Sequence, residues 1–481
     1  MRFSILYSNA NNKQFKLFNI ADELNLKEII RQIMPNESAY ILDLLKKAPC
    51  CKCDIELRQE NIKFFTENID FYEAFKMILE SFNKTVNEEE QIKDSKLWYG
   101  SNINRHSISL EFIKCVRAAI RIFSYIDKIN DLFSNLSLNL PKNLAGFQQL
   151  ISYMCDNDNY LELKNTLLMI VNSNPDSLEM NVRLKLNSLF FVESISVDNF
   201  EKNIIHSEEH LKKSFLNRFT KKVWDEEKNE NVLNEDFNKY FEVSIKNFMN
   251  LINAMTKSVI DFIAGLGEEL LFYEFSIRLI NVAKKNNIRY SFPELSEQSD
   301  IKLESVYDIN LVLNCNRHAD LLIKSNDFIM NSDKGIAFII GPNKSGKTVF
   351  LRSIALSCIF GNCGLPVLAQ KSRLPMLESI FFHFAKEEQF NLNDYGHFED
   401  EVVELKNTVD NLKTKSIVLI NEIFQSTSED EAVEALIPLI TYFNNNKVNV
   451  IFVTHLKDLP SRFKNERLLY KFNTDFSCEL E

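Results

Sequence analysis

The sequence predicts a long α-helical region followed by an α/β domain with a mostly parallel sheet. Only 10 glycines and 10 prolines interrupt the 481 residues, and 39 phenylalanines supply large apolar side chains, which favours long helices over turn-rich β structure. From about residue 306, short apolar runs alternate with amphipathic stretches, as is typical of strands covered by helices on both faces. We therefore expect a helical domain over 1–290 and an α/β domain over 291–481.

The chain is moderately acidic, with 56 Lys and Arg against 67 Asp and Glu and a formal net charge of −11. This balance argues against binding nucleic acid by net charge alone, although a local basic strip remains compatible with it. No run of about 18 apolar residues predicts a membrane span. The N-terminus turns polar too early for a secretory signal, so we expect a cytoplasmic protein with no membrane partner.

The nine cysteines follow no regular spacing, which predicts reduced thiols. Cys50, Cys51 and Cys53 form the only cluster in the sequence. Three such thiols can bind zinc, but no second Cys pair or neighbouring His completes a tetrahedral set. A metal site at this cluster is therefore the less favoured interpretation.

In the helical region, apolar residues recur at three- and four-residue steps after one possible strand from Phe3 to Tyr7. The longest pattern covers roughly 234–287, which as a single helix would extend about 75 Å. Because this length exceeds a compact domain, we expect either a strut or two helices broken near Gly265 and Gly267. Shorter helices are predicted over 20–30, 60–83, 108–136 and 143–172.

In the α/β region, each helix lies between two apolar strands, which predicts parallel pairing. Pro293 ends the preceding helical pattern. The predicted elements are a strand at 335–340, a helix at 349–361, a strand at 416–420, a helix at 429–443 and a strand at 448–453.

A phosphate-binding loop pattern, GxxxxGK[ST], lies between the first of these strands and the first helix. Its residues are Gly341, Pro342, Asn343, Lys344, Ser345, Gly346, Lys347 and Thr348. The glycines let backbone N–H groups converge on a phosphate at a helix N-terminus. Lys347 would neutralise the β- and γ-phosphates, and Thr348 would hold Mg²⁺ through its hydroxyl. The pattern predicts a P-loop nucleotide-binding domain.

The other two strands end in polar residues that would lie beside the phosphates. Asn421 and Glu422 follow the strand at 416–420, and His455 follows the strand at 448–453. We expect Glu422 to be the general base. Asn421 occupies the metal side of the site but is neutral, so it can coordinate Mg²⁺ only weakly. A lone His is usually structural, but the position of His455 favours a role at the γ-phosphate.

Several short segments around this loop are distinctive in combination. They are Gly341-Pro342-Asn343, Arg352, Ala369-Gln370-Lys371, Glu422 with Ser426-Thr427-Ser428, and Val453-Thr454-His455 with Asp458-Leu459. Together they resemble the MutS family of DNA mismatch-repair ATPases over roughly residues 260–460. The first 250 residues are similar to the family's core and lever region only in their helical character.

The resemblance implies an ABC-type ATPase that binds ATP and Mg²⁺ and works as a homodimer, in which each subunit completes the nucleotide site of the other. It implies that Lys347 and Thr348 hold phosphate and Mg²⁺, and that Glu422 is the catalytic base. The remaining implied roles are Gln370 as the glutamine-loop residue near the metal, His455 as the switch histidine, Asn326 near the adenine and Glu401 in the signature helix.

The chain departs from the family pattern at two positions. Asn421 stands where the family has Asp, and Gly396 stands where a hydroxyl residue usually begins the signature helix. The first change removes a charge from the magnesium shell, and the second removes a donor aimed across the dimer. Loss of one such contact can slow turnover by about 10²–10³. Slow hydrolysis with retained ATP binding is therefore expected as one outcome.

The family's mismatch-reading and connector domains have no counterpart in this pattern, because helices begin near residue 20. The Phe-x-Glu triplets at 65–67, 71–73 and 191–193 lie on predicted helices, where we expect chance occurrences rather than a base wedge. His206 and His210 form an HxxEH pattern, but a solvated helix is favoured over a protease site. The basic stretch over 212–222 is a candidate DNA-backbone contact, with a solvated helix face as the alternative.

The sequence thus favours a MutS-like, dimeric DNA-binding ATPase that acts on DNA structure rather than on mismatches. The alternative is an ATP-gated scaffold that binds a protein partner, hydrolyses little ATP and does not bind DNA. The net charge of −11, Asn421 and Gly396 favour the alternative.

Overall fold

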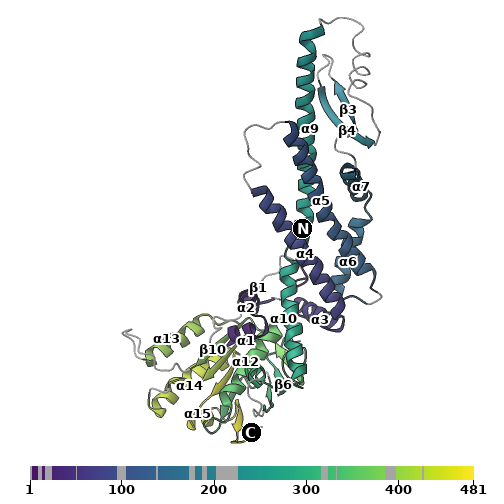
Figure 1. Ribbon diagram of the computed structural model, residues 1–481. Helices are drawn as coiled ribbons and strands as arrows, with labels where there is room; N and C mark the ends of the chain where they lie inside the picture. The colour runs from purple at the N-terminus through teal and green to yellow at the C-terminus, as the bar shows by residue number, and fades with distance from the viewer. Residues whose placement is uncertain are drawn as a thin grey trace. The chain divides into compact units, whose positions relative to one another are not determined.

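The computed structural model describes residues 3–8, 14–16, 24–49, 51–94, 105–136, 139–172, 179–186, 192–201, 226–315, 323–331, 333–384, 397–424 and 427–481 (Figure 1). Within these ranges a mainly helical region precedes one in which helices and strands alternate, as the sequence predicts. Among the helices so described, none is both long enough and apolar enough to cross a membrane.

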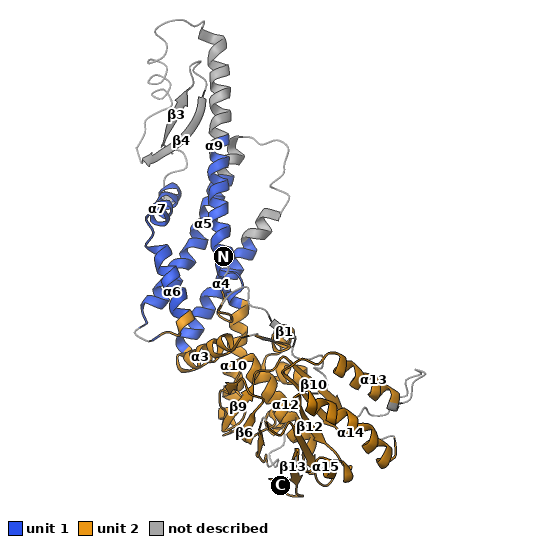
Figure 2. Cartoon of the chain, turned by 180° about the vertical axis from the view of Figure 1, so that it is seen from behind, with its two compact units in different colours: residues 1–3, 70–139, 144–267 blue, residues 4–69, 140–143, 268–481 orange. Residues whose placement is uncertain are grey.

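The chain divides into two compact units that are discontinuous in sequence (Figure 2). Unit 1 contains residues 1–3, 70–139 and 144–267, and unit 2 contains residues 4–69, 140–143 and 268–481. Residues 4–69 and 268–290 lie within the predicted helical domain over 1–290, and in the structure they pack with the α/β part in unit 2.

Unit 1 is built from long helices around an aromatic core. The ring of Phe133 meets those of Phe71, Phe75 and Phe147 edge-on, at centroid distances of 5.1, 5.4 and 5.5 Å. Such T-shaped pairs add to the stabilisation from buried apolar area. The helices are α4 (Ile69–Asp94), α5 (Arg105–Ser134), α6 (Lys142–Cys155), α7 (Asp158–Asn172) and α9 (Glu226–Ile263).

The longest predicted helical pattern is two helices, as one of the two alternatives expects. Helix α9 ends at Ile263 and α10 (Leu266–Lys285) begins three residues later. Gly265 adopts a φ of +90°, which an L side chain rarely tolerates and which ends the first helix. A Cβ on Gly267 would lie 2.6 Å from Asn83 Nδ2, so a side chain there would require the Asn83 amide to shift.

An antiparallel strand pair in unit 1 was not predicted. Strands β3 (Glu179–Leu186) and β4 (Val192–Glu201) pair with two irregularities of register. Met180, Val182, Leu184 and Leu186 alternate with polar residues, which is the period of a strand. The helical prediction overlooked this local change of period.

Two sheets organise unit 2. The larger has the order β10-β11-β12-β8-β13-β14, and its pairs are parallel except for the antiparallel β13–β14 edge. The smaller has the order β5-β9-β6-β7 and is mixed. The strands are β5 (Glu294–Ser296), β6 (Ile301–Val306), β7 (Asn326–Met330), β8 (Ile336–Ile340), β9 (Lys371–Pro375), β10 (Ser379–Phe384), β11 (Ser416–Asn421), β12 (Asn449–Val453), β13 (Arg467–Phe472) and β14 (Cys478–Leu480).

Both faces of the larger sheet are buried. Phe338 and Phe452 belong to the cluster that packs against Leu436 of helix α14 (Glu429–Asn445), while Ile339 and Leu419 point to the opposite face and are equally buried. The smaller sheet was not predicted, because polar residues interrupt each of its strands, which lack the apolar runs of β8 and β12. The helices of unit 2 are α1 (Leu26–Ile33), α2 (Ser38–Leu45), α3 (Lys52–Glu67), α10, α11 (Ile309–Cys315), α12 (Lys347–Cys363), α13 (His397–Asp410), α14 (Glu429–Asn445) and α15 (Asp458–Arg462), with β1 (Gln14–Lys16) pairing antiparallel to β2 (Lys47–Pro49).

Buried polar contacts explain why residues 4–69 belong to unit 2. Arg58 of α3 is fully buried. Its Nε donates to the Leu6 carbonyl at 3.1 Å, and its Nη1 donates to the Cys363 carbonyl at 2.8 Å. The guanidinium also lies 5.0 Å from the ring centroid of Phe272. Residues 3–8 form no strand, since side chains rather than a neighbouring strand hold their backbone.

Cys51 and Cys53, at the start of α3, are joined by a disulfide. The expectation of reduced thiols is therefore wrong for this pair, whose Cα atoms lie 5.3 Å apart, within the range that a disulfide spans. Their sulfur atoms and the Asp54 carboxylate are the one group of potential metal ligands found in the described residues. Sulfurs joined in a disulfide are not the thiolates that zinc requires.

Candidate functional site

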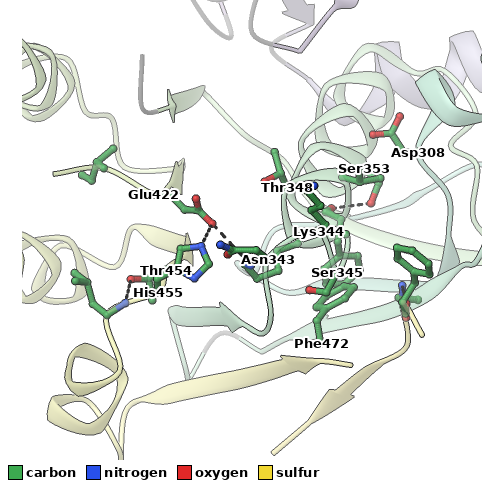
Figure 3. Close-up of a pocket in the computed structure, with 18 of the residues that line it drawn as sticks. Asp308, Asn343, Lys344, Ser345, Thr348, Ser353, Glu422, Thr454, His455 and Phe472 are labelled. Carbon is green, nitrogen blue, oxygen red and sulfur yellow. Dashed lines mark hydrogen bonds and ion pairs between the residues drawn. The ribbon is translucent and has the colours of Figure 1, made fainter. Parts of the chain in front are cut away.

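The loop 341–346 joins the central strand β8 to the N-terminus of α12 (Figure 3). Three of its residues have positive φ: Gly341 at +151°, Lys344 at +63° and Gly346 at +95°. A Cβ on Gly341 would lie 2.7 Å from the Phe472 carbonyl oxygen, so only glycine fits there. The loop therefore turns tightly in front of the first helical N–H groups, where an anion is stabilised by the helix dipole.

Lys347 is buried at the first position of α12, with a relative exposure of 4%. Its ammonium group donates to the carbonyl oxygens of Gly341 at 3.1 Å and Pro342 at 2.9 Å. It also lies 3.9 Å from Glu422 Oε1. Burial lowers the pKa of Lys347, and the nearby Glu422 carboxylate opposes this shift. The cation thus points back into its own loop, where a phosphate oxygen could replace the carbonyls.

Thr348 and Asn421 form a direct pair at the end of β11. The Thr348 hydroxyl donates to Asn421 Oδ1 at 3.1 Å. Asn421 is 8% exposed, so this amide is largely shielded from water. Both groups offer neutral oxygen atoms, and neither brings a negative charge to a cation.

Glu422 and His455 meet at the carboxyl ends of β11 and β12. His455 Nε2 lies 2.7 Å from Glu422 Oε1, an arrangement in which the ring N–H donates to the carboxylate (Figure 3). Glu422 has a φ of +53°, and its N–H donates to the Val453 carbonyl at 3.0 Å. Because β11 and β12 are parallel neighbours, the residues after them reach the same edge of the sheet.

The segment after Glu422 is held by helix α13. Glu401 Oε2 accepts a hydrogen bond from the Phe424 N–H at 2.8 Å, and Phe424 has a φ of +62°. The sequence singles out Glu401 as a signature-helix residue, and the structure shows it supporting the loop that follows Glu422. Thr427 and Ser428 donate to Glu431, which makes them part of the N-terminal cap of α14.

These groups line one cavity of about 980 Å³. The loop residues 343–348, Glu422 and His455 contribute to its wall, as does Asn326 at the start of β7. Asn326 Oδ1 accepts from the Cys478 N–H at 3.0 Å, which ties β7 to the C-terminal hairpin. The volume is within the range of small-molecule sites.

The cavity also has walls that the sequence analysis missed: Asp308, Lys324, Phe472 and Phe476. Asp308 is 3% exposed, and burial raises its pKa despite the opposing charge of Arg352. Its Oδ1 accepts from the Asn310 N–H at 2.6 Å, as an N-cap residue does, and this local signal could have identified it. The other three required the tertiary fold to be recognised.

Other predicted residues do not reach the cavity or fall outside the described structure. Gln370 is exposed, its N–H donates to the Glu304 carbonyl at 2.8 Å, and it is not among the described residues that line the cavity. Phe65 and Phe71 are buried core residues, as expected for chance Phe-x-Glu triplets. Gly396, Ser426, Phe191, His206, His210 and the basic stretch 212–222 lie outside the described residues.

The described donors fit Mg²⁺ only in part. In P-loop NTPases this ion bridges phosphate oxygens and is held by a Ser or Thr hydroxyl and an Asp carboxylate. Thr348 supplies the hydroxyl, but the neutral Asn421 takes the place of the acid. Of the three expected ligands, Thr348 lines the cavity, whereas Asn421 and Gln370 are not among the described residues of its wall.

Comparisons with known proteins agree with the sequence resemblance. Residues 337–479 match MutS domain V. The chain is 28% identical over 221 residues to the DNA mismatch repair protein MutS of Leptospira interrogans, 28% identical over 174 residues to Endonuclease MutS2 of Streptococcus thermophilus, and 29% identical over 182 residues to MutS of Wolbachia pipientis.

These alignments cover 43%, 35% and 37% of this chain and 24%, 20% and 21% of the respective relatives. The chain thus spans no more than about a quarter of the length of the curated relatives it matches. The shared part includes the loop 341–348, Glu422 and His455. Residues 337–479 of the chain thus match the ATPase-type domain V of the MutS family.

Proposed function

We propose that unit 2 binds ATP in the cavity at the N-terminus of α12 and hydrolyses it slowly. The observation that carries the proposal is the convergence of Lys347, Thr348, Glu422 and His455 on one cavity next to a glycine-bounded loop. These are the groups that phosphoryl transfer to water requires: a cation, a hydroxyl, a general base and a residue that orients the base.

The first role of these residues would be to bind the phosphates. The Lys347 ammonium group would exchange the Gly341 and Pro342 carbonyls for phosphate oxygens, with little movement of its buried stem. The N–H groups at the start of α12 would add a further positive field. Any Mg²⁺ would be carried chiefly by the phosphates and would touch the chain at Thr348 and Asn421.

The second role would be to activate water. Glu422 would accept a proton from the attacking water, and His455 would hold the carboxylate through Oε1. In the described structure this carboxylate also lies near Lys347, so phosphate binding would draw the lysine away and free the base. Nucleotide binding and base activation would thus be coupled through one side chain.

Phosphate release in steady state tests this assignment. A Glu422→Gln variant should lose about 10²–10³ in turnover and keep its affinity for ATP. Glu434→Gln is a matched control, because Glu434 is 73% exposed and meets only a distant Arg462, at 3.9 Å. Equal rates for wild type and Glu422→Gln, above the protein-free background, would show that another group is the base.

At the level of the whole protein, we propose a dimeric ATPase that acts on DNA structure rather than on mismatches. The support is the match of residues 337–479 to MutS domain V together with relatives named as a DNA mismatch repair protein and an endonuclease. Fluorescence anisotropy with duplex and branched DNA, with and without ATP, tests this proposal. Affinity that falls steeply with salt is expected, because phosphate contacts release counterions.

The second candidate is an ATP-gated scaffold for a protein partner. It is favoured by the formal net charge of −11, which does not attract DNA, and by the Thr348–Asn421 pair, which brings no negative charge to a cation. Absence of DNA binding at every salt concentration, with saturable ATP binding and a Glu422→Gln rate equal to background and wild type, would favour this candidate.

A further inference from the structure

The pair Thr348–Asn421 is where the chain would meet a divalent cation, and its chemistry is neutral. Asn421 is shielded from water, and its Oδ1 is already satisfied by the Thr348 hydroxyl at 3.1 Å. A carboxylate in the same shielded place would carry an uncompensated charge and so would require a cation. The amide has no such requirement, because it forms a complete hydrogen bond without a metal.

Lysines and acids both line the described cavity wall. Lys324, Lys344 and Lys347 lie near the start of α12, and Asp308, Glu422 and Glu429 line the same cavity. Lys324 is paired with Asp475 at 3.0 Å, so the phosphates would rely on Lys344 and Lys347. Lys347 is held mainly by neutral carbonyls, which compete less with phosphate than a carboxylate would. Lys344 is exposed at the turn of the loop. These two ammonium groups and the N–H groups at the start of α12 can bind phosphate oxygens in the absence of Mg²⁺.

We propose that the site takes the nucleoside triphosphate as the metal-free anion, with an affinity that hardly depends on divalent cations. This inference rests on the proposed ATP site and specifies the form of its ligand. It also accounts for slow hydrolysis. The positive charge of Mg²⁺ stabilises the phosphoryl group during transfer, and a site that does not hold the ion in place loses this stabilisation.

The test compares binding of a fluorescent ATP analogue in MgCl₂ with binding in EDTA, using the full chain. For wild type, the two dissociation constants should agree within about threefold. For Asn421→Asp, Mg²⁺ should tighten binding at least about tenfold, since the new carboxylate pairs with the ion. A wild-type affinity that falls at least about tenfold in EDTA overturns the inference.

A second readout needs no nucleotide. Mg²⁺ alone should raise the midpoint of thermal unfolding of Asn421→Asp and leave that of wild type unchanged. Asn449→Asp is the matched control, because Asn449 is also buried at one end of a strand of the same sheet and donates to the Ser299 carbonyl at 2.7 Å. Asn449 lies at the start of β12, opposite Ile417, whereas Asn421 lies at the end of the parallel strand β11, so the same charge change occurs at the other edge of the sheet and should create no response to Mg²⁺. A response equal to that of Asn421→Asp would contradict the assigned position.

The outcomes separate this inference from the proposed function. If wild type shows no saturable uptake in either buffer, the ATP site itself is disproved, and the inference falls with it. If uptake is saturable in MgCl₂ and absent in EDTA, the ATP site stands and only the inference fails. Should Asn421→Asp fail to fold, the wild-type titration in the two buffers still decides the question.

Discussion

The two ends of helix α12 differ in what binds their unpaired backbone groups. At its N-terminus, the loop 341–346 leaves the first N–H groups facing a cavity of about 980 Å³. At its C-terminus, Gly364 turns the chain with a φ of +87°, and the buried Arg58 donates to the Cys363 carbonyl. The N-terminus of α12 can bind an anion, whereas at its C-terminus a buried cation of the same protein binds a helix carbonyl.

This difference shows how one buried helix serves both stability and binding. A helix has unsatisfied donors at its start and unsatisfied acceptors at its end. The chain pairs the acceptors at the end of α12 with the Gly364 and Leu365 N–H groups and with Arg58, a residue of the N-terminal segment, and leaves the donors at its start for a ligand. Three substitutions test this comparison and a fourth tests a helix of unit 1; they follow in order of decreasing expected effect.

The largest loss of stability is expected from a substitution at the C-terminus of α12. Arg58→Met should lower the free energy of unfolding by about 3 kcal/mol, because the Leu6 and Cys363 carbonyls lose their donors while remaining buried. Chemical denaturation monitored by circular dichroism measures this change. Arg462→Met is the control, with an expected loss below about 1 kcal/mol, since Arg462 is 58% exposed. Equal losses for the two variants would show that the buried cation does not close the helix.

A substitution at the N-terminus of α12 should change the affinity for ATP rather than the stability of the protein. Lys347→Met should weaken ATP binding at least about 100-fold, or about 2.7 kcal/mol, because the buried ammonium group is lost from the phosphate site. Isothermal titration calorimetry measures the affinity, with Lys464→Met as an exposed control in the same unit. Unchanged affinity in Lys347→Met would place the nucleotide elsewhere.

A smaller effect is expected at the tight turn of the loop. Gly341→Ala should cost about 1–3 kcal/mol, because its φ of +151° and the Phe472 carbonyl at 2.7 Å both oppose a Cβ. Gly335→Ala is the control within the same strand region, since its nearest heavy atom would lie at 3.6 Å. Thermal unfolding distinguishes them. A Gly341→Ala protein as stable as Gly335→Ala would mean that the loop relaxes freely.

The smallest effect, of opposite sign, is expected in unit 1. Gly146 lies inside α6, and a Cβ there would meet nothing within 4 Å. Gly146→Ala should therefore stabilise the protein by about 0.5–1 kcal/mol through a better helix propensity. Destabilisation in the same thermal assay would indicate a contact that the described structure does not contain.

The site could be predicted well from sequence where its residues follow strands. Lys347, Glu422 and His455 each follow an apolar run that predicts a parallel strand. The carboxyl ends of parallel strands meet at one edge of the sheet, so these residues are expected to lie close together. Gln370 carried no such support, since its assignment came from resemblance alone, and the structure leaves it outside the cavity wall. Lys324 and Phe476 could not be found, because their proximity depends on the pairing of β13 with β14 and on the turn between them.

The fold, like the site, could be predicted from the sequence only in part. Apolar period and the rarity of Gly and Pro indicated the helices, and Gly265 marked the break between α9 and α10. The change of period at β3 was overlooked, and the strands of the smaller sheet contain polar residues instead of the apolar runs that identified β8 and β12.

The amino-acid sequence by itself determined the order of helical and α/β parts, the phosphate-loop pattern and the neutral amide at position 421, because each is written in adjacent or regularly spaced residues. Tertiary contacts alone show that residues 4–69 join unit 2, that Arg58 pairs with the end of α12 and that Lys324 lines the cavity. These facts depend on contacts between segments as much as 305 residues apart. Such contacts leave no local period, because they are selected by burial and hydrogen bonding in the folded chain.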